Sequence, residues 1–127
     1  TLTGAMVTTL GKACTGIMGN NQELLDQVTE AGRDTGEKYW QLPMFDEYKE
    51  LIKSDVADMK NSGGRQAGSI SAAFLLAEFV GDTPWVHMDI AGTSTADRTK
   101  GYQVKGATGV PARTLAKLAL NLAKLGA

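Results

Sequence analysis

The sequence predicts an α/β domain, and three stretches carry that prediction. Trp85–Gly92 is a short apolar run, interrupted by His87 and Asp89 and bounded by turn residues, which is typical of a buried strand. Gln66–Val80 is apolar on almost every side, as expected of a helix buried all round. The third stretch is a helix opened by Pro111, whose apolar stripe consists of Leu115, Leu118, Leu122 and Leu125.

The N-terminal third adds a second strand and a second helix. Thr1–Gly4 has the pattern of a strand end that breaks into a loop, and Ala5–Leu10 is apolar enough for either a helix or a strand. Thr15–Gly19 fits a short buried strand. The next helix is predicted to start with a cap at Asn20 and with Glu23 three positions on, and to end at Gly32 and Gly36.

The middle of the chain gives weaker signals. Tyr39–Leu42 is predicted to be a small connector, and Pro43 to occupy the first turn of a helix that reaches Lys53. Val56–Met59 is a strand candidate. Ala96–Gly109 is polar, rich in glycine and carries basic residues, so we expect a long loop that is functional or mobile.

Composition excludes several classes of protein. Apolar residues make up 43% and charged residues 21% of the 127 residues, which is ordinary for a globular domain and argues against disorder. The formal net charge of −1 gives no electrostatic footprint for nucleic acid or for a membrane surface. Cys14 is the single cysteine, so no disulfide framework is possible and a reducing compartment, the cytoplasm, is expected.

No complete catalytic motif is present. The segment from Gly4 to Gly11 is too long for a phosphate-binding loop, and Lys12 is followed by alanine instead of serine or threonine. A histidine-based zinc site is impossible with His87 alone, and no Gly-x-Ser-x-Gly sequence exposes a serine nucleophile. The residues by themselves therefore predict no catalytic and no metal-binding side chain in this chain.

Three local features remain open to two interpretations. Asp55 and Asp58 could share a metal or a proton if their segment is helical, although a solvated pair is the commoner outcome. Gly63–Arg65 could cradle an anion with its backbone N–H groups or form a plain cap and turn. His87 and Asp89 are expected to be hydrogen-bonded partners within the sheet, while the loop Ala91–Ser94 beyond the strand is the first candidate for a site wall.

Seven stretches in order resemble the leucyl (cytosol) aminopeptidase family, the hexameric two-metal exopeptidases. They cover essentially the whole chain and are Thr1–Ala5 with Leu10–Gly11, Trp40–Pro43, Glu47–Tyr48, Ser54–Asp58, Asn61–Arg65, Trp85–Gly92 and Lys105–Pro111. The resemblance is to the C-terminal portion of the catalytic domain. It implies a partial three-layer domain, with a mixed β-sheet flanked by helices on both faces.

The resemblance also implies a chemistry. In that family two divalent metal ions, zinc or manganese, activate a water that attacks the N-terminal peptide bond, and bicarbonate held by an arginine shuttles the proton. The acidic ligands lie in an Asn-Thr-Asp-Ala-Glu-Gly-Arg motif, which these residues do not contain. We therefore expect the metal ligands upstream of Thr1, in a longer protein, and expect residues 1–127 alone to be inactive.

What the resemblance places on this chain is substrate recognition. Thr1, Leu2 and Gly4 match positions that hold the substrate backbone and wall the first side-chain pocket, and Ala91 and Ser94 match the other wall of that pocket. Residue 94 is often larger in the family, so the side-chain preference is open.

The loop Asn61–Arg65 borders the next pocket in the family. Ser62 stands there in place of an aliphatic residue, which predicts a more polar or roomier leaving-side pocket. The partners expected from the resemblance are peptide substrates, the upstream part of the same protein and further copies in a homo-hexamer. The alternative is a non-catalytic α/β module that binds a ligand or supports oligomerisation.

Overall fold

The computed structural model describes residues 1–126 and confirms the predicted α/β class. Its main sheet has the strand order β2-β1-β3, with β1 parallel to β2 and antiparallel to β3, so the sheet is mixed. A second sheet is a small ribbon of two strands, β4 and β5. The strands are β1 (Thr15–Gly19), β2 (Tyr39–Gln41), β3 (Val86–Asp89), β4 (Thr95–Ala96) and β5 (Gly106–Ala107).

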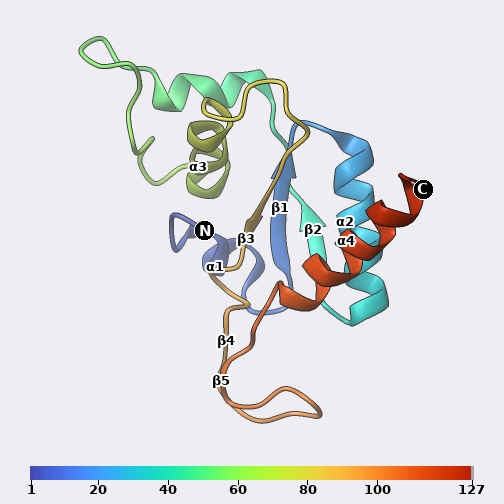
Figure 1. Ribbon diagram of the computed structural model, residues 1–127. Coiled ribbons are helices and arrows are strands. Elements are labelled where there is room, and N and C mark those ends of the chain that lie inside the picture. Colours follow the sequence, from blue (N-terminus) through green and yellow to red (C-terminus); the bar gives the residue numbers. More distant parts are fainter. Residues whose placement is uncertain (127) are drawn as a thin grey trace.

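Helices cover both faces of the main sheet, as the three-layer prediction requires (Figure 1). On one face α2 packs against α4, and on the other α3 packs against α1 and against a 3-10 helix, η1. The helices are α1 (Ala5–Leu10), α2 (Gln22–Thr35), η1 (Asp46–Ile52), α3 (Gly68–Ala77) and α4 (Ala112–Leu125). Within residues 1–126, none of them combines the length and the apolar character needed to cross a membrane.

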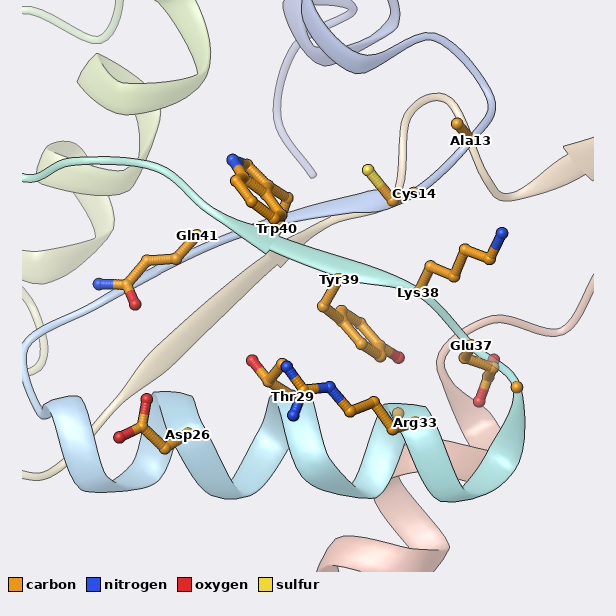
Figure 2. A pocket seen from close by; sticks show the side chains of 12 residues that line it. Ala13, Cys14, Asp26, Thr29, Arg33, Glu37, Lys38, Tyr39, Trp40 and Gln41 are labelled. Carbon is orange, nitrogen blue, oxygen red and sulfur yellow. The ribbon is translucent and has the colours of Figure 1, made fainter.

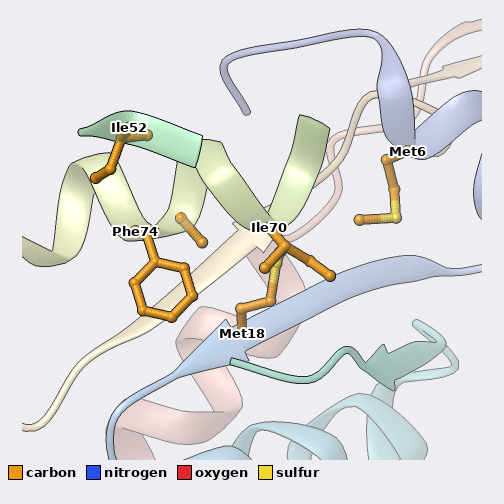
Figure 3. Packing of buried hydrophobic residues seen from close by; sticks show 6 residues of the cluster. Met6, Met18, Ile52, Ile70 and Phe74 are labelled. Carbon is orange, nitrogen blue, oxygen red and sulfur yellow. The ribbon is translucent and has the colours of Figure 1, made fainter. Parts of the chain in front are cut away.

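Alternation along β1 supplies both cores, because successive side chains of a strand point to opposite faces of the sheet. Met18 belongs to the larger cluster, where it lies with Met6, Ile70 and Phe74 beneath α1 and α3 (Figure 3). Ile17 belongs to the smaller cluster beneath α2, in which the other buried members are Leu25, Val28 and Tyr39. Ile70, Ala73 and Phe74 of the predicted helix 66–80 belong to the larger cluster. The helix is not buried all round, because α3 occupies only residues 68–77 and Phe79 beyond it is 79% exposed.

The leucine stripe of α4 is only partly buried in this chain. Leu118 packs against the smaller cluster, whereas Leu115, Leu122 and Leu125 expose 49%, 41% and 73% of their surface. Within residues 1–126, Leu118 is therefore the one member of the stripe that packs against a core cluster.

Five local predictions were wrong in detail, the first being the strand end expected at Thr1–Gly4, where the structure has no strand. The cap of α2 is Asn21, whose side chain accepts a hydrogen bond from the Leu24 N–H at 2.8 Å. Asn20 instead accepts a hydrogen bond from the Trp85 N–H at 2.8 Å and so ties β1 to the start of β3. The connector at 39–42 contains β2, which pairs with β1 from Tyr39 to Gln41 and was too short for a periodic signal.

The segment after Pro43 also departs from expectation. The helix is of the 3-10 type and begins only at Asp46, because Phe45 caps it in an extended conformation. Residues 56–59 form turns and no strand, and Val56 is 96% exposed. The predicted long loop 96–109 is confirmed for most of its length, apart from the short pairing of β4 with β5.

Candidate functional site

Two adjoining cavities lie between the N-terminal loop and the loop that leads into α3. Their volumes are about 860 and 200 Å³. Thr3, Ser62, Gly64 and Gly68 line both of them. The arrangement follows from the packing of α1 against α3, which brings residues some sixty positions apart in the sequence to the same walls.

Three of the predicted substrate-binding residues meet at these cavities. Leu2 and Ser62 line the smaller cavity, and Gly4 and Ser62 line the larger one. Gly4 has open space around the position of a missing side chain, so the peptide backbone is exposed to whatever enters. A wall made of backbone and small side chains suits an elongated ligand whose own backbone must approach closely.

Thr1 and Ala91 lie close to each other at the end of β3. The Thr1 Oγ1 atom accepts a hydrogen bond from the Ile90 backbone N–H at 2.6 Å. The backbone N–H of Ala91 donates to Asp89 Oδ1 at 3.1 Å, and the Ala91 side chain packs against the larger core cluster. The hydrogen bond from Ile90 thus joins the first residue of the N-terminal loop to the loop that follows β3.

Ser94 is not brought to either cavity within the described residues. Its backbone N–H donates to Ile90 O at 2.9 Å, and its carbonyl accepts from Thr108 N at 2.9 Å, so it holds β4 close to β5. The prediction of a pocket wall at Ala91 and Ser94 therefore stays a prediction.

Sequence reasoning missed several polar residues that line the larger cavity. Thr8 and Thr9 come from α1 and Ser69 from the first turn of α3, whereas Arg65, which also lines this cavity, belongs to the loop that the resemblance had singled out. Ser69 is buried, and its Oγ atom has no hydrogen-bond partner within residues 1–126. A buried hydroxyl normally has a partner, so the Ser69 hydroxyl, unpaired in the described part of the chain, is an exception among the buried polar groups at this cavity. No sequence signal marked it, because it falls in an otherwise apolar helix.

The backbone of the loop is unusual at its end. Gly64 has a φ of 91° and Ala67 a φ of 48°, and Ala67 is the one residue other than glycine with a left-handed φ in the described part of the chain. A non-glycine residue in this region costs about 1 kcal/mol or more, which the packing of α3 must offset. Gly63–Arg65 thus shapes the cavity wall, and the plain-turn interpretation of this segment accounts for its geometry.

His87 and Asp89 lie on the face of β3 that meets α3, since His87 pairs with Met18 across the sheet. Both are buried, and the ring of His87 stacks on Trp85 with a centroid distance of 6.2 Å. Burial lowers the pKa of His87. Within the described residues, His87 Nε2 and Asp89 Oδ2 have no partner, so the predicted pairing inside the sheet is incomplete.

The metal-ligating residue types do not gather anywhere in residues 1–126: no group of three His, Cys, Asp or Glu side chains is close enough to hold an ion. Asp55 and Asp58 are exposed and lie in turns, where the Ser54 Oγ atom accepts hydrogen bonds from Val56 N and Ala57 N. The helical pair that would make them neighbours is therefore absent. These residues do not by themselves fit a metal centre.

A separate cavity of about 770 Å³ lies between α2 and the open edge of the sheet at β2 (Figure 2). Trp40, which is 67% exposed, lines this cavity together with Lys38 and Arg33. Burial raises the pKa of the neighbouring Tyr39 hydroxyl to about 12. The edge of β2 has no further strand beside it within residues 1–126.

Comparison with known proteins gives one consistent result. The sequence pattern described as the catalytic domain of the cytosol aminopeptidase family matches residues 1–116. A probable cytosol aminopeptidase of Alkaliphilus metalliredigens is 51% identical over 124 residues, which are 98% of this chain and 25% of that protein. The chain thus spans about a quarter of the length of the curated relatives it matches.

Solved structures agree with the sequence matches. A mutant of tomato leucine aminopeptidase superposes with a TM-score of 0.86 at 38% identity, over 94% of this chain and 23% of that one. The bottromycin maturation enzyme BotP, in complex with Mn, gives a TM-score of 0.88 at 31% identity, over 94% and 27%. The fold of this chain is therefore shared with these solved structures.

Proposed function

The chain belongs to the cytosol aminopeptidase family, and on that premise we propose that residues 1–127 are the C-terminal portion of the catalytic domain of a metal-dependent leucyl aminopeptidase. The whole protein would remove N-terminal residues from peptides. The observation that carries the proposal is the pair of adjoining cavities walled by Leu2, Gly4 and Ser62.

The contribution of this chain would be binding and orientation of the peptide. Leu2 and Gly4 would wall the pocket for the first side chain together with Ala91 and Ser94, and Thr1 would hold the substrate backbone. Ser62 would border the pocket for the second residue. Except for Arg65, the side chains that line the two cavities in residues 1–126 are uncharged, which supports a site that selects peptides by shape.

Two divalent ions, zinc or manganese, would be held by a part of the protein outside this chain, together with any bicarbonate. Two observations support this. Within residues 1–126 no three His, Cys, Asp or Glu side chains lie close enough together to hold an ion, and the chain spans only a quarter of the length of its relatives. The manganese in the complex with BotP supports a metal-dependent enzyme of this kind. The exposed leucines of α4 support contact with another part of the protein or with another copy in a homo-hexamer. The proposed location is the cytoplasm, because the relatives are named cytosol aminopeptidases.

The experiment compares the full-length protein with isolated residues 1–127 on leucyl-glycine, with added manganese or zinc and with a chelator. We expect the full-length protein to release leucine only with the metal, and the isolated chain to release none. A full-length protein that stays inactive with every divalent ion, while still binding dipeptides, would favour the rival function of a non-catalytic binding module. Metal-independent release would contradict the proposal.

The pocket assignment has a test of its own at Ser62. Substituting Ser62→Ile adds apolar surface at the border of the second pocket, and so we expect kcat/KM to rise about tenfold for leucyl-leucine relative to leucyl-serine. The control is Thr83→Ile, which adds similar surface at an exposed position away from both cavities. An unchanged ratio in Ser62→Ile, or an equal change in the control, would remove Ser62 from the substrate site.

A further inference from the structure

A fourth cavity, of about 420 Å³, lies beneath the segment that joins β4 to β5. The ends of four separate elements form it: the start of β1, the C-terminal end of α2, the loop around residues 93–103 and the first turn of α4. None of its lining residues lines the two cavities proposed for the peptide. Much of its wall comes from the loop 96–109, which the sequence predicts to be functional or mobile. The proposed function gives this loop no role.

Cationic side chains dominate this cavity. Lys38, Arg98, Lys100 and Arg113 line it, and no ion pair forms at any of them within residues 1–126. Lys12 is a fifth cation, and its Nζ atom pairs with Asp97 Oδ1 at 2.5 Å. Four positive charges from three elements are therefore left without a counter-charge around one space.

The two acidic residues of the cavity do not neutralise these charges. Asp97 is already engaged by Lys12. Glu37 is 5% exposed, and its Oε1 atom accepts hydrogen bonds from the Thr114 N–H at 2.7 Å and from the Thr114 hydroxyl at 3.0 Å. The carboxylate of Glu37 thus serves the first turn of α4, which contains no acidic residue of its own.

The loop is held in place over the cavity by contacts from Tyr102. The Tyr102 hydroxyl donates to Gly36 O at 3.4 Å, at the end of α2. The Arg113 guanidinium lies over the ring of Tyr102, 4.6 Å from its centroid. Stacking fixes the plane of the guanidinium and leaves its N–H groups free for a planar or tetrahedral oxyanion.

We propose that this cavity binds a phosphate group. A doubly charged oxyanion with several acceptor oxygens is the ligand that clustered arginine and lysine side chains bind best, through charge-assisted hydrogen bonds. The volume lies within the range of about 300–1,000 Å³ that small-molecule sites occupy. The phosphate can be free or carried by a small molecule, since both present the same oxygens.

The test is isothermal titration calorimetry of the full-length protein with inorganic phosphate and, separately, with phenyl phosphate at constant ionic strength. We expect saturable binding that is weakened about tenfold by Lys100→Ala, the loss of one charge-assisted hydrogen bond, and less than about twofold by Lys105→Ala. Lys105 is the matched control, because it removes the same charge from the same loop without lining the cavity.

The two probes separate the sources of the phosphate. Tighter binding of phenyl phosphate would identify an organic phosphate, and tighter binding of inorganic phosphate would identify the free ion. Absence of saturable binding of both, or equal losses in Lys100→Ala and Lys105→Ala, would overturn the proposal. Arg98→Ala provides the same comparison should Lys100→Ala lower the melting temperature, and the measurement needs no peptide turnover, so it is independent of the proposed peptidase activity.

Discussion

The two faces of the sheet carry cavities of opposite character. Beneath α1 and α3 the walls are backbone, hydroxyls and small side chains, with Arg65 as the one charged lining residue among those described. At the ends of α2 and α4 the walls carry unpaired cations. The strand β1 contributes to the core on each face, because Met18 and Ile17 belong to the two different clusters.

This difference shows how one small sheet can support two kinds of selection. An uncharged cavity discriminates by shape and by the few hydrogen bonds it offers, whereas a cationic cavity discriminates by charge. Both faces contain buried polar groups without a partner among the described residues: Ser69 and His87 beneath α3, and the Tyr39 hydroxyl in the smaller core. Glu37, by contrast, accepts two hydrogen bonds from Thr114 of α4.

The largest expected effect comes from Gly92, which lies against Gly11 at the end of α1. A Cβ atom at Gly92 would lie 1.8 Å from the Gly11 carbonyl oxygen, a backbone atom that cannot move away alone. We expect Gly92→Ala to lower the free energy of unfolding of the full-length protein by about 3 kcal/mol or more, as overpacking does. Urea denaturation measures this, and loss of soluble protein would be the extreme form of the same result.

Gly4→Ala is the matched control for that substitution. Gly4 has a φ of −86° and nothing within 4 Å of an added Cβ atom, so the free energy of unfolding should change by less than about 1 kcal/mol. Equal losses of unfolding free energy in the two variants would mean that the close contact with Gly11 does not restrict the side chain at position 92.

The next effect tests the charge-bearing face alone. Glu37→Ala removes the acceptor for two donors of the buried Thr114, and we expect a loss of about 2 kcal/mol in the free energy of unfolding. Glu37→Gln keeps an oxygen in place and should lose less. Glu30→Ala, at an exposed position of α2, is the control and should be close to neutral. Equal stability of Glu37→Ala and Glu30→Ala would contradict this role.

The smallest effect at neutral pH is at Tyr39, whose pKa burial raises to about 12. The unfolded state loses this proton near pH 10 and the folded state only near pH 12, so the contribution to stability is complete below pH 10 and is lost as the pH rises toward 12. At pH 11 the loss is about 1 kcal/mol.

Tyr39→Phe should remove that part of the pH dependence. Because the Tyr39 hydroxyl has no hydrogen-bond partner in the described residues, the substitution should be nearly neutral at pH 7. Thermal melts of both proteins between pH 8 and 11 measure the difference, and lysine titration is common to the two. Parallel curves over this range would show that Tyr39 keeps its ordinary pKa.

The sequence by itself determined the elements whose side chains repeat over several turns or along a buried strand. The period of the apolar residues placed α2 and α4, and the apolar run from Trp85 placed β3, because these patterns depend on neighbours within a few residues. The resemblance to the family added the mixed sheet and the loop Asn61–Arg65 as a pocket border.

Only the tertiary structure decided what distant residues do together. β2 is three residues long and exists because β1 lies beside it, and the bond of Glu37 to Thr114 joins positions 77 residues apart. Within residues 1–126, Arg98, Lys100 and Arg113 form no ion pair, and this likewise depends on which acidic residues the fold places near them. Such contacts arise when separate elements pack together, and no local pattern of residue types encodes that packing.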